Sequence, residues 1–167
     1  RLDIAFDHFG ADPEVMREKG KDSRNLELLE ARLAEVPDDL LTWFYLASQH
    51  WVAGRTDEAV TAFEKVVQYY NRDPSRYGMA IRNVPVAYSY VGLIRGLIKK
   101  GRLKEGLTVA YSAIDSFPNH PDVLFQAGLI KMQLNDFDQA RDCFERASKV
   151  QMTGYGLISM NDRTIQE

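Results

Sequence analysis

The stretches Ala87–His120 (AYSYVGLIRGLIKKGRLKEGLTVAYSAIDSFPNH) and Pro121–Met152 (PDVLFQAGLIKMQLNDFDQARDCFERASKVQM) decide the fold of this chain. The second copy begins 34 residues after the first, at 121 against 87. The first copy carries Gly101, Gly106, Ala110, Ala113 and Pro118, and the second carries Asn135, Ala140, Phe144 and Ala147 in matching places. A period of this length is typical of a helix-turn-helix repeat. One such unit cannot bury its apolar face alone, so the sequence predicts a stack of helix pairs.

An earlier copy of the same unit begins at Leu40. It contains Trp43, Leu46, Ala47, Gly54, Ala59 and Phe63. Gly54 can adopt the left-handed conformation that ends a helix, and Thr56 is a plausible N-cap for the next one. Together the three copies predict helices over Leu40–Ala53, Asp57–Tyr70, Ala87–Lys100, Leu103–Ser116, Pro121–Leu134 and Phe137–Val150.

The period is interrupted after Tyr70. The next copy is due near Pro74 but begins near Ala87, so residues 71–86 are an insertion that contains Pro74, Gly78 and Pro85. The pattern leaves two alternatives open, a longer loop or an extension of one helix followed by a loop. Insertions in repeat proteins usually emerge on one face, where they can contact a ligand.

The two ends of the chain lack the repeat. Leu2, Ile4 and Phe6 alternate with polar residues, so residues 1–10 are expected to be an extended lead-in that could end an upstream catalytic domain. Residues 11–39 predict a long helix, or half repeat, that starts at Asp12-Pro13-Glu14. Residues 153–167 predict a loop and the start of a truncated further helix. Because the chain opens without methionine, we expect it to be a piece of a longer protein.

Composition bounds the function classes. The chain has 167 residues, about one domain, with 45% hydrophobic and 27% charged residues, as is usual for globular proteins. A net charge of −3 gives no basic footprint for nucleic acid or anionic membrane. The most apolar stretch, Leu40–Ala53, is too short to span a bilayer. The single cysteine, Cys143, excludes an intrachain disulfide and a cysteine-built zinc site. We therefore expect a cytoplasmic protein.

No catalytic or cofactor site is predicted in this chain. The histidines His8, His50 and His120 lie in different elements without metal-ligand spacing. Cys143 lies beside an aromatic residue in a helix pattern, which predicts a buried and inert thiol. The triplet Asp136-Phe137-Asp138 spells Asp-x-Asp but lies at a turn between two helices. We expect its first residue to cap the helix, in a capping box with Gln139, and its phenylalanine to pack.

These offsets resemble the tetratricopeptide repeat, a family with aromatic residues in the first helix and small residues where the two helices cross. The resemblance implies an all-α fold, a right-handed α-α superhelix of antiparallel helix pairs, with three repeats over residues 40–152. In that family the first helix of each pair lines a concave face. The matching positions are Leu41, Phe44, Ser48, Trp51, Tyr88, Val91, Arg95, Asp122, Phe125, Leu129 and Met132, with Lys99 nearby.

The expected groove is apolar around one cation, Arg95. Our hypothesis is that it binds a peptide or protein partner through Trp51, Tyr88 and Phe125 as apolar anchors. The asparagine of the family's carboxylate clamp is missing, so a peptide's terminal carboxylate is not predicted as the ligand. The alternative is that a catalytic domain, later repeats or a second copy of the chain in a homo-oligomer covers these residues.

A second resemblance concerns the start of the chain. The run from Phe6–Gly10 through Lys21 and Arg24–Leu29 to Pro37–Asp39 is similar to a junction in bacterial family-two glycosyltransferases. It implies that the chain is the non-catalytic repeat region of such an enzyme. His8 then matches the late histidine that holds the divalent metal in the whole enzyme. Two alternatives stay open, a free-standing adaptor without a catalytic parent and a fragment in which His8 retains a metal-ligand role.

Overall fold

The computed structural model describes residues 21–150, and within this range every element is helical. The inner helices are α3 (Leu40–Val52), α6 (Ala87–Lys99) and α8 (Pro121–Gln133). The outer helices are α2 (Lys21–Glu35), α4 (Thr56–Arg72), α7 (Leu103–Ser116) and α9 (Phe137–Lys149). Residues 1–20 and 151–167 lie outside the described range. The same holds for the expected lead-in, the helix start at Asp12, the tail and His8.

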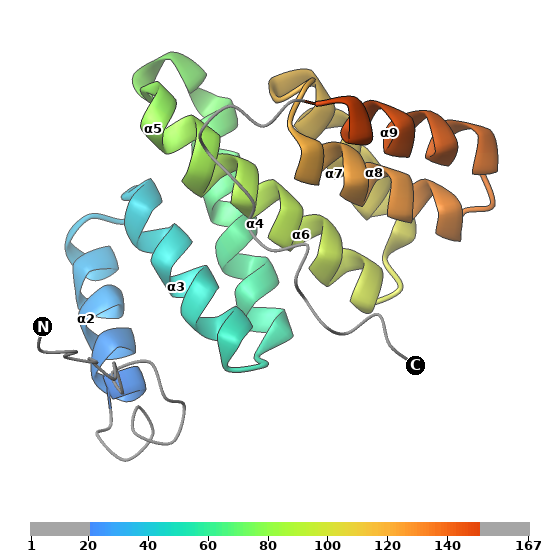
Figure 1. Ribbon diagram of the computed structural model, residues 1–167. Coiled ribbons are helices and arrows are strands. Elements are labelled where there is room, and N and C mark those ends of the chain that lie inside the picture. Colours follow the sequence, from blue (N-terminus) through green and yellow to red (C-terminus); the bar gives the residue numbers. More distant parts are fainter. Residues whose placement is uncertain (1–20, 151–167) are drawn as a thin grey trace, which may run out of the picture.

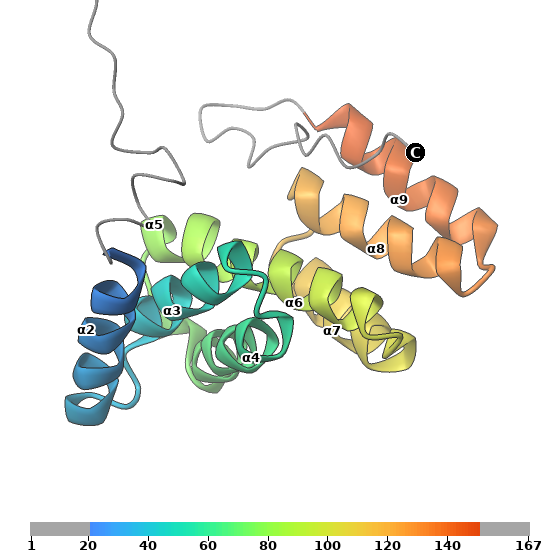
Figure 2. The ribbon, with the colours of Figure 1, turned by 90° about the horizontal axis from the view of Figure 1, so that it is seen from below.

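The helices form antiparallel pairs, α3 with α4, α6 with α7 and α8 with α9 (Figure 1). Helix α2 packs on α3 without an inner helix of its own among the described residues, as expected for a half repeat. The outer helices form an arc around the inner helices when the molecule is turned by 90° (Figure 2). The inner helices consequently have one side against the outer layer and one side on the concave surface.

Each pair turns through one residue with a left-handed backbone. These residues are Gly54 (φ 74°), Gly101 (φ 70°) and Asn135 (φ 62°). Asparagine is one of the few residues besides glycine that tolerate this conformation, which explains the substitution in the third pair. The prediction for Gly54 is thus confirmed, and all three turns share one geometry.

The predicted caps are only partly correct. Thr56 is the first residue of α4 and does not cap it, because the N-cap position falls on Arg55, which makes no side-chain cap bond. The carboxylate of Asp136 does cap α9 by accepting a hydrogen bond from the Gln139 backbone N–H (3.4 Å). The capping box is incomplete, because the Gln139 side chain accepts instead from Lys131 Nζ (2.6 Å).

The expectation that Phe137 packs is wrong. Its side chain is 62% exposed. It is the first residue of α9, at the open turn end of the α8–α9 pair, and the buried positions of this helix are Ala140 and Cys143.

The inner and outer layers meet at close helix crossings. Gly92 of α6 lies against Phe63 of α4, and Gly128 of α8 lies against Phe144 of α9. A Cβ atom added at either glycine would stand 2.5 Å from the facing ring. Such contact requires a residue without a side chain, and the large ring fills the space it leaves. Small residues therefore let the helices approach, as the repeat pattern predicts.

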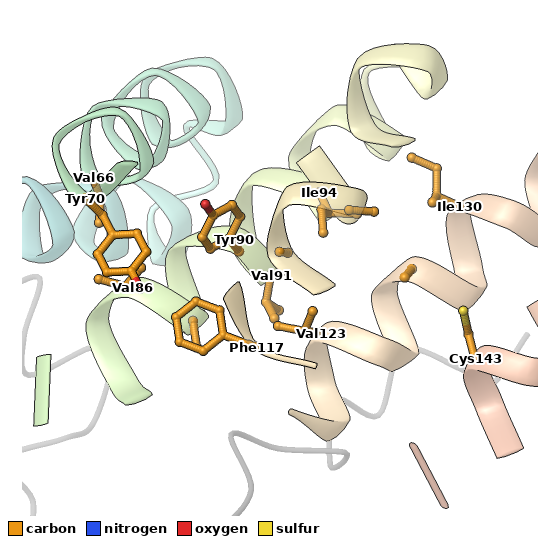
Figure 3. Close-up of a cluster of buried hydrophobic side chains, with 14 of the residues drawn as sticks. Val66, Tyr70, Val86, Tyr90, Val91, Ile94, Phe117, Val123, Ile130 and Cys143 are labelled. Carbon is orange, nitrogen blue, oxygen red and sulfur yellow. The ribbon is translucent and has the colours of Figure 1, made fainter. Parts of the chain in front are cut away.

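A continuous apolar cluster fills the space between the layers (Figure 3). The stacked rings of Tyr70 and Phe117 (6.1 Å between centroids) form one end of it, and Cys143 the other. Cys143 is buried, as predicted, and this burial raises the pKa of its thiol, which keeps it protonated. This cluster thus runs from the first pair to the third, and a second buried cluster, which includes Phe63 and Leu97, joins α3, α4 and α6.

The insertion 71–86 extends an inner helix and adds a short loop, the second of the two alternatives. After α4 the chain forms a 3₁₀ turn (Pro74–Arg76), and then α5 (Met79–Ile81) and a π-helix (Arg82–Val86) run directly into α6. Pro85 lies inside this helical run. Proline cannot donate the usual backbone hydrogen bond, and a wider π-turn is one way to accommodate it. The hydroxyl of Ser89 donates to the Pro85 carbonyl at 2.7 Å.

Candidate interaction surface

The concave face is the side of α3, α6 and α8 that is turned away from the outer helices. Helix periodicity places the twelve predicted residues on or beside it, four on each inner helix: Leu41, Phe44, Ser48 and Trp51; Tyr88, Val91, Arg95 and Lys99; Asp122, Phe125, Leu129 and Met132. The three inner helices run in the same direction, because each is antiparallel to the outer helix between them.

Two ring contacts join α3 to α6 across this face. The rings of Phe44 and Tyr88 meet edge to face, with centroids 5.9 Å apart and an interplanar angle of 85°. The guanidinium carbon of Arg95 lies 5.2 Å from the centroid of the Trp51 ring. Both contacts use residues seven apart on each helix, 44 and 51 on α3 and 88 and 95 on α6. They therefore form two rungs, two helical turns apart.

Exposure separates the twelve residues. Val91 is only 7% exposed and belongs to the buried cluster. Its place in the predicted groove is thus corrected, because α8 packs against this part of α6 and covers it. Lys99 and Met132 are exposed, the latter to 43%. The remaining nine are half-buried, so they support the helices and still present part of their surface to solvent.

On α8, Phe125 also packs within its own helix pair. Its ring lies 5.5 Å from the ring of Phe144 on α9, measured between centroids. Part of the Phe125 surface is therefore used by the α8–α9 contact, and only the remainder is open. By contrast, Met132 near the end of α8 is exposed.

Two exposed apolar residues of α3 are absent from the predicted set. Tyr45 is 55% exposed and Val52 is 87% exposed. With Leu41 and Ser48 they follow the spacing of one helical stripe, at positions 41, 45, 48 and 52, opposite the side of α3 that packs on α4. This spacing is visible in the sequence. The sequence does not show that this stripe is exposed, because α3 is apolar on nearly every side. The buried stripe and the exposed stripe therefore cannot be told apart by pattern alone.

The charges of the concave face are few and uneven. Arg95 and Lys99 bring positive charge to α6, and Asp122 brings a carboxyl to α8. Burial raises the pKa of Asp122, against the opposing influence of His120. Two bases and one acid among the twelve residues give this face a small excess of positive charge.

His120 lies at the start of α8 and is half-buried. Burial lowers its pKa, which is partly offset by Asp122 and by the backbone of Asn83 in the π-helix. Among the described residues, its Nδ1 atom finds no hydrogen-bond partner. The expected turn position is confirmed, since His120 is the N-cap residue of α8. His120 thus interacts with Asn83 of the insertion and with Asp122 of α8, the first helix of the third pair.

The described residues offer no metal centre. Within residues 21–150 no three His, Cys, Asp or Glu side chains are grouped closely enough to hold an ion. Asp138 accepts a hydrogen bond from Arg141 (3.4 Å), and His50 Nδ1 accepts one from Arg55 Nε (2.9 Å). We also find no helix in this range that is long and apolar enough to cross a membrane.

Comparison with known proteins gives the repeat type. Models of the tetratricopeptide repeat match residues 42–70 and 121–151. A solved structure of MamA superposes with a TM-score of 0.65 at 16% identity, covering 89% of this chain and 77% of that one. The MamA labelled MSR-1 gives 0.58 at 22% identity, covering 87% and 80%. The MamA labelled AMB-1 gives 0.61 at 21% identity, covering 81% and 67%. No curated protein matches the sequence significantly.

These likenesses establish the fold. Two segments of the chain match the tetratricopeptide repeat, and the described residues form an α-solenoid of antiparallel helix pairs, as the sequence predicts. At such identities a shared fold carries no partner or activity with it. The function therefore has to be argued from the concave face itself.

Proposed function

We propose that this repeat chain is a protein-interaction scaffold that holds a segment of a partner along its concave face. The observation that carries the proposal is the pair of rungs, Phe44–Tyr88 and Arg95 over Trp51. They fix four large side chains on a surface that remains partly open. Aromatic side chains lose little conformational freedom on binding, and aromatic and arginine side chains dominate many interfaces.

The surface favours a partner segment with apolar side chains and at least one carboxylate. Apolar groups can lie against the exposed stripe that includes Leu41, Tyr45 and Val52, while Lys99 stands exposed on the neighbouring inner helix. A carboxylate near Lys99 and Arg95 would lie among the positive charges of α6. An extended or helical segment is compatible with the parallel inner helices, as in other helical grooves.

The catalytic context remains a prediction. Of the residues that resemble a glycosyltransferase junction, Phe6–Gly10 lie outside the described range, whereas the rest lie in α2 and the turn after it. The repeat models and structures named above include no glycosyltransferase. A free-standing adaptor is equally compatible with the repeat fold. The gene sequence upstream of Arg1 separates the two contexts, because only an enzyme parent requires an α/β domain with an Asp-x-Asp motif there.

A displayed library of random peptides, selected on the immobilised full chain, tests the proposed surface. We expect selected peptides to be apolar and acidic, and to lose at least tenfold in affinity for Trp51→Ala and Met132→Glu, a loss of about 1.4 kcal/mol. The matched control is Phe137→Ala, which removes an exposed aromatic outside the concave face. Peptides that bind all three variants as tightly as the parent chain would refute the proposal.

A further inference from the structure

We propose that the C-terminal segment of this same chain, residues 151–167, occupies the concave face when no partner is bound. The inference rests on the proposed function, because it assigns an occupant to the same surface. It makes the scaffold self-occupied, so that a partner has to displace the segment in order to bind.

The segment begins beside the concave face. Helix α9 ends at Lys149 and runs antiparallel to α8, so the chain emerges near the start of α8. Consistent with this position, Arg146 donates a hydrogen bond to the carbonyl of Pro118, just before α8 (3.2 Å). The connection from α7 to α8 likewise carries the chain from the outer layer to the inner layer at this end of the stack.

The segment is long enough to reach every part of the face. Its 17 residues (151–167) could span about 55 Å when extended, at about 3.3 Å per residue. An inner helix of 13 residues is about 20 Å long, and neighbouring helices lie about 8–10 Å apart. The open end of α3 is therefore within reach even if part of the segment forms a turn at Gly154 and Gly156.

The composition of the segment complements that of the face. Its apolar residues are Met152, Tyr155, Leu157, Ile158, Met160 and Ile165. Its acids, Asp162 and Glu167, suit the positive charges that Arg95 and Lys99 bring to α6, and Arg163 is its only base. This is the apolar and acidic chemistry that the proposed function requires of a partner.

The opposite end of the chain fits this surface less well. Residues 1–20 carry eight charged side chains (Arg1, Asp3, Asp7, Asp12, Glu14, Arg17, Glu18 and Lys19), whereas residues 151–167 carry three (Asp162, Arg163 and Glu167). Each charge placed on an apolar surface without a partner opposes binding. The C-terminal segment is therefore the better occupant from within the chain.

Carbodiimide coupling on the dilute full chain tests the inference, because it joins only amines and carboxylates in direct contact. We expect monomeric material to contain an amide between Lys99 and Asp162 or Glu167. Coupling of Lys100 to Asp57, which form an ion pair, is the internal positive control. Exposed Lys104 on outer helix α7 is the negative control, for which no tail cross-link is expected.

The outcomes separate this inference from the proposed function. Cross-links from Lys99 to the tail that occur only in a dimer, or to acids of residues 1–20 in place of the tail, would overturn it. A chain without tail cross-links that still binds the selected peptides through Trp51 would overturn self-occupation and leave the scaffold function standing. A chain with tail cross-links that yields no such peptides would overturn the scaffold function and leave self-occupation standing.

A tail variant gives a second readout. Leu157→Asp with Ile158→Asp should weaken self-occupation without touching the helices of the described range. We expect the selected peptide to bind this variant about fivefold more tightly, because a larger fraction of chains then has an open face. Unchanged affinity would contradict the inference.

Discussion

The inner helices present two faces that are built from similar residues but packed differently. Toward the outer helices, rings meet glycines, as Phe63 meets Gly92, and the side chains are fully buried. Toward the concave side, rings meet rings or a cation, and most side chains stay half-exposed. The contrast indicates that the first face stabilises the fold, while the second retains surface for binding. Substitutions on each face can break or sharpen that division.

The largest expected effect is on the packed face. Phe63→Ala removes a fully buried ring and should cost about 3–5 kcal/mol in unfolding free energy. The matched variant on the other face is Phe125→Ala, which removes a half-buried ring and should cost clearly less. Denaturant unfolding followed by circular dichroism measures both. Equal losses would show that the two faces do not differ in their contribution to stability.

A smaller effect is expected where the helices cross. Gly92→Ala places a Cβ against the Phe63 ring and should destabilise the chain by about 1–3 kcal/mol. Helix propensity alone favours alanine by about 1 kcal/mol, so a net loss isolates the crossing. Gly78→Ala is the control, because a Cβ there meets nothing within 4 Å. If Gly92→Ala proves as harmless as the control, the close crossing is not needed.

On the concave face, the contact of Arg95 with Trp51 should contribute modestly to stability. A double-mutant cycle with Arg95→Gln and Trp51→Leu should give a coupling energy of about 0.5–1 kcal/mol, as for other cation–π pairs at solvent-accessible sites. The unfolding free energies of the four chains supply the measurement. A coupling energy larger than that of contacts in the core would show that the Arg95–Trp51 contact mainly stabilises the fold and does not serve as a binding surface.

The smallest expected effect is a pH dependence. Burial lowers the pKa of His50 and His120, so in the folded chain both favour the neutral form. The unfolded chain, with ordinary histidine pKa values near 6.5, then takes up protons first. The unfolding free energy is therefore greatest above pH 6.5 and falls as the pH drops below this value. The slope is limited, because the two histidines together take up fewer than two protons on unfolding.

Two variants identify the groups responsible for the pH dependence. His120→Gln should flatten it in denaturant unfolding at pH 7.5, 6.5 and 5.5. Asp122→Asn should steepen it, because the Asp122 carboxylate partly offsets the lowering of the His120 pKa. If both variants follow the parent chain, these groups do not set the pH response.

The fold was predictable because local signals and the repeat agree. Every repeat helix begins and ends within two residues of its predicted bounds, and Leu103–Ser116 matches at both ends. The turn at Gly54 follows from backbone conformation alone. The π-turn at Pro85 was not predictable, because a proline normally ends a helix, and here the packing of the extension overrides that preference.

The concave face was harder to predict than the fold. The repeat pattern says which helices line it, but burial depends on neighbours that the pattern does not describe. Val91 is covered by α8, whereas Tyr45 and Val52 are open although they resemble core residues. Hydrophobic spacing indicates a face of a helix, and only tertiary packing decides whether another helix covers it.

The most direct test of the division between the two faces is to map which residues change their amide chemical shifts when a segment binds. Amide chemical shifts of the full chain should be recorded by two-dimensional NMR with and without a selected apolar and acidic peptide. We predict that the largest changes fall on α3, α6 and α8, around Tyr45, Trp51 and Arg95, with little change in α4 and α7. Changes centred on the outer helices would contradict the account.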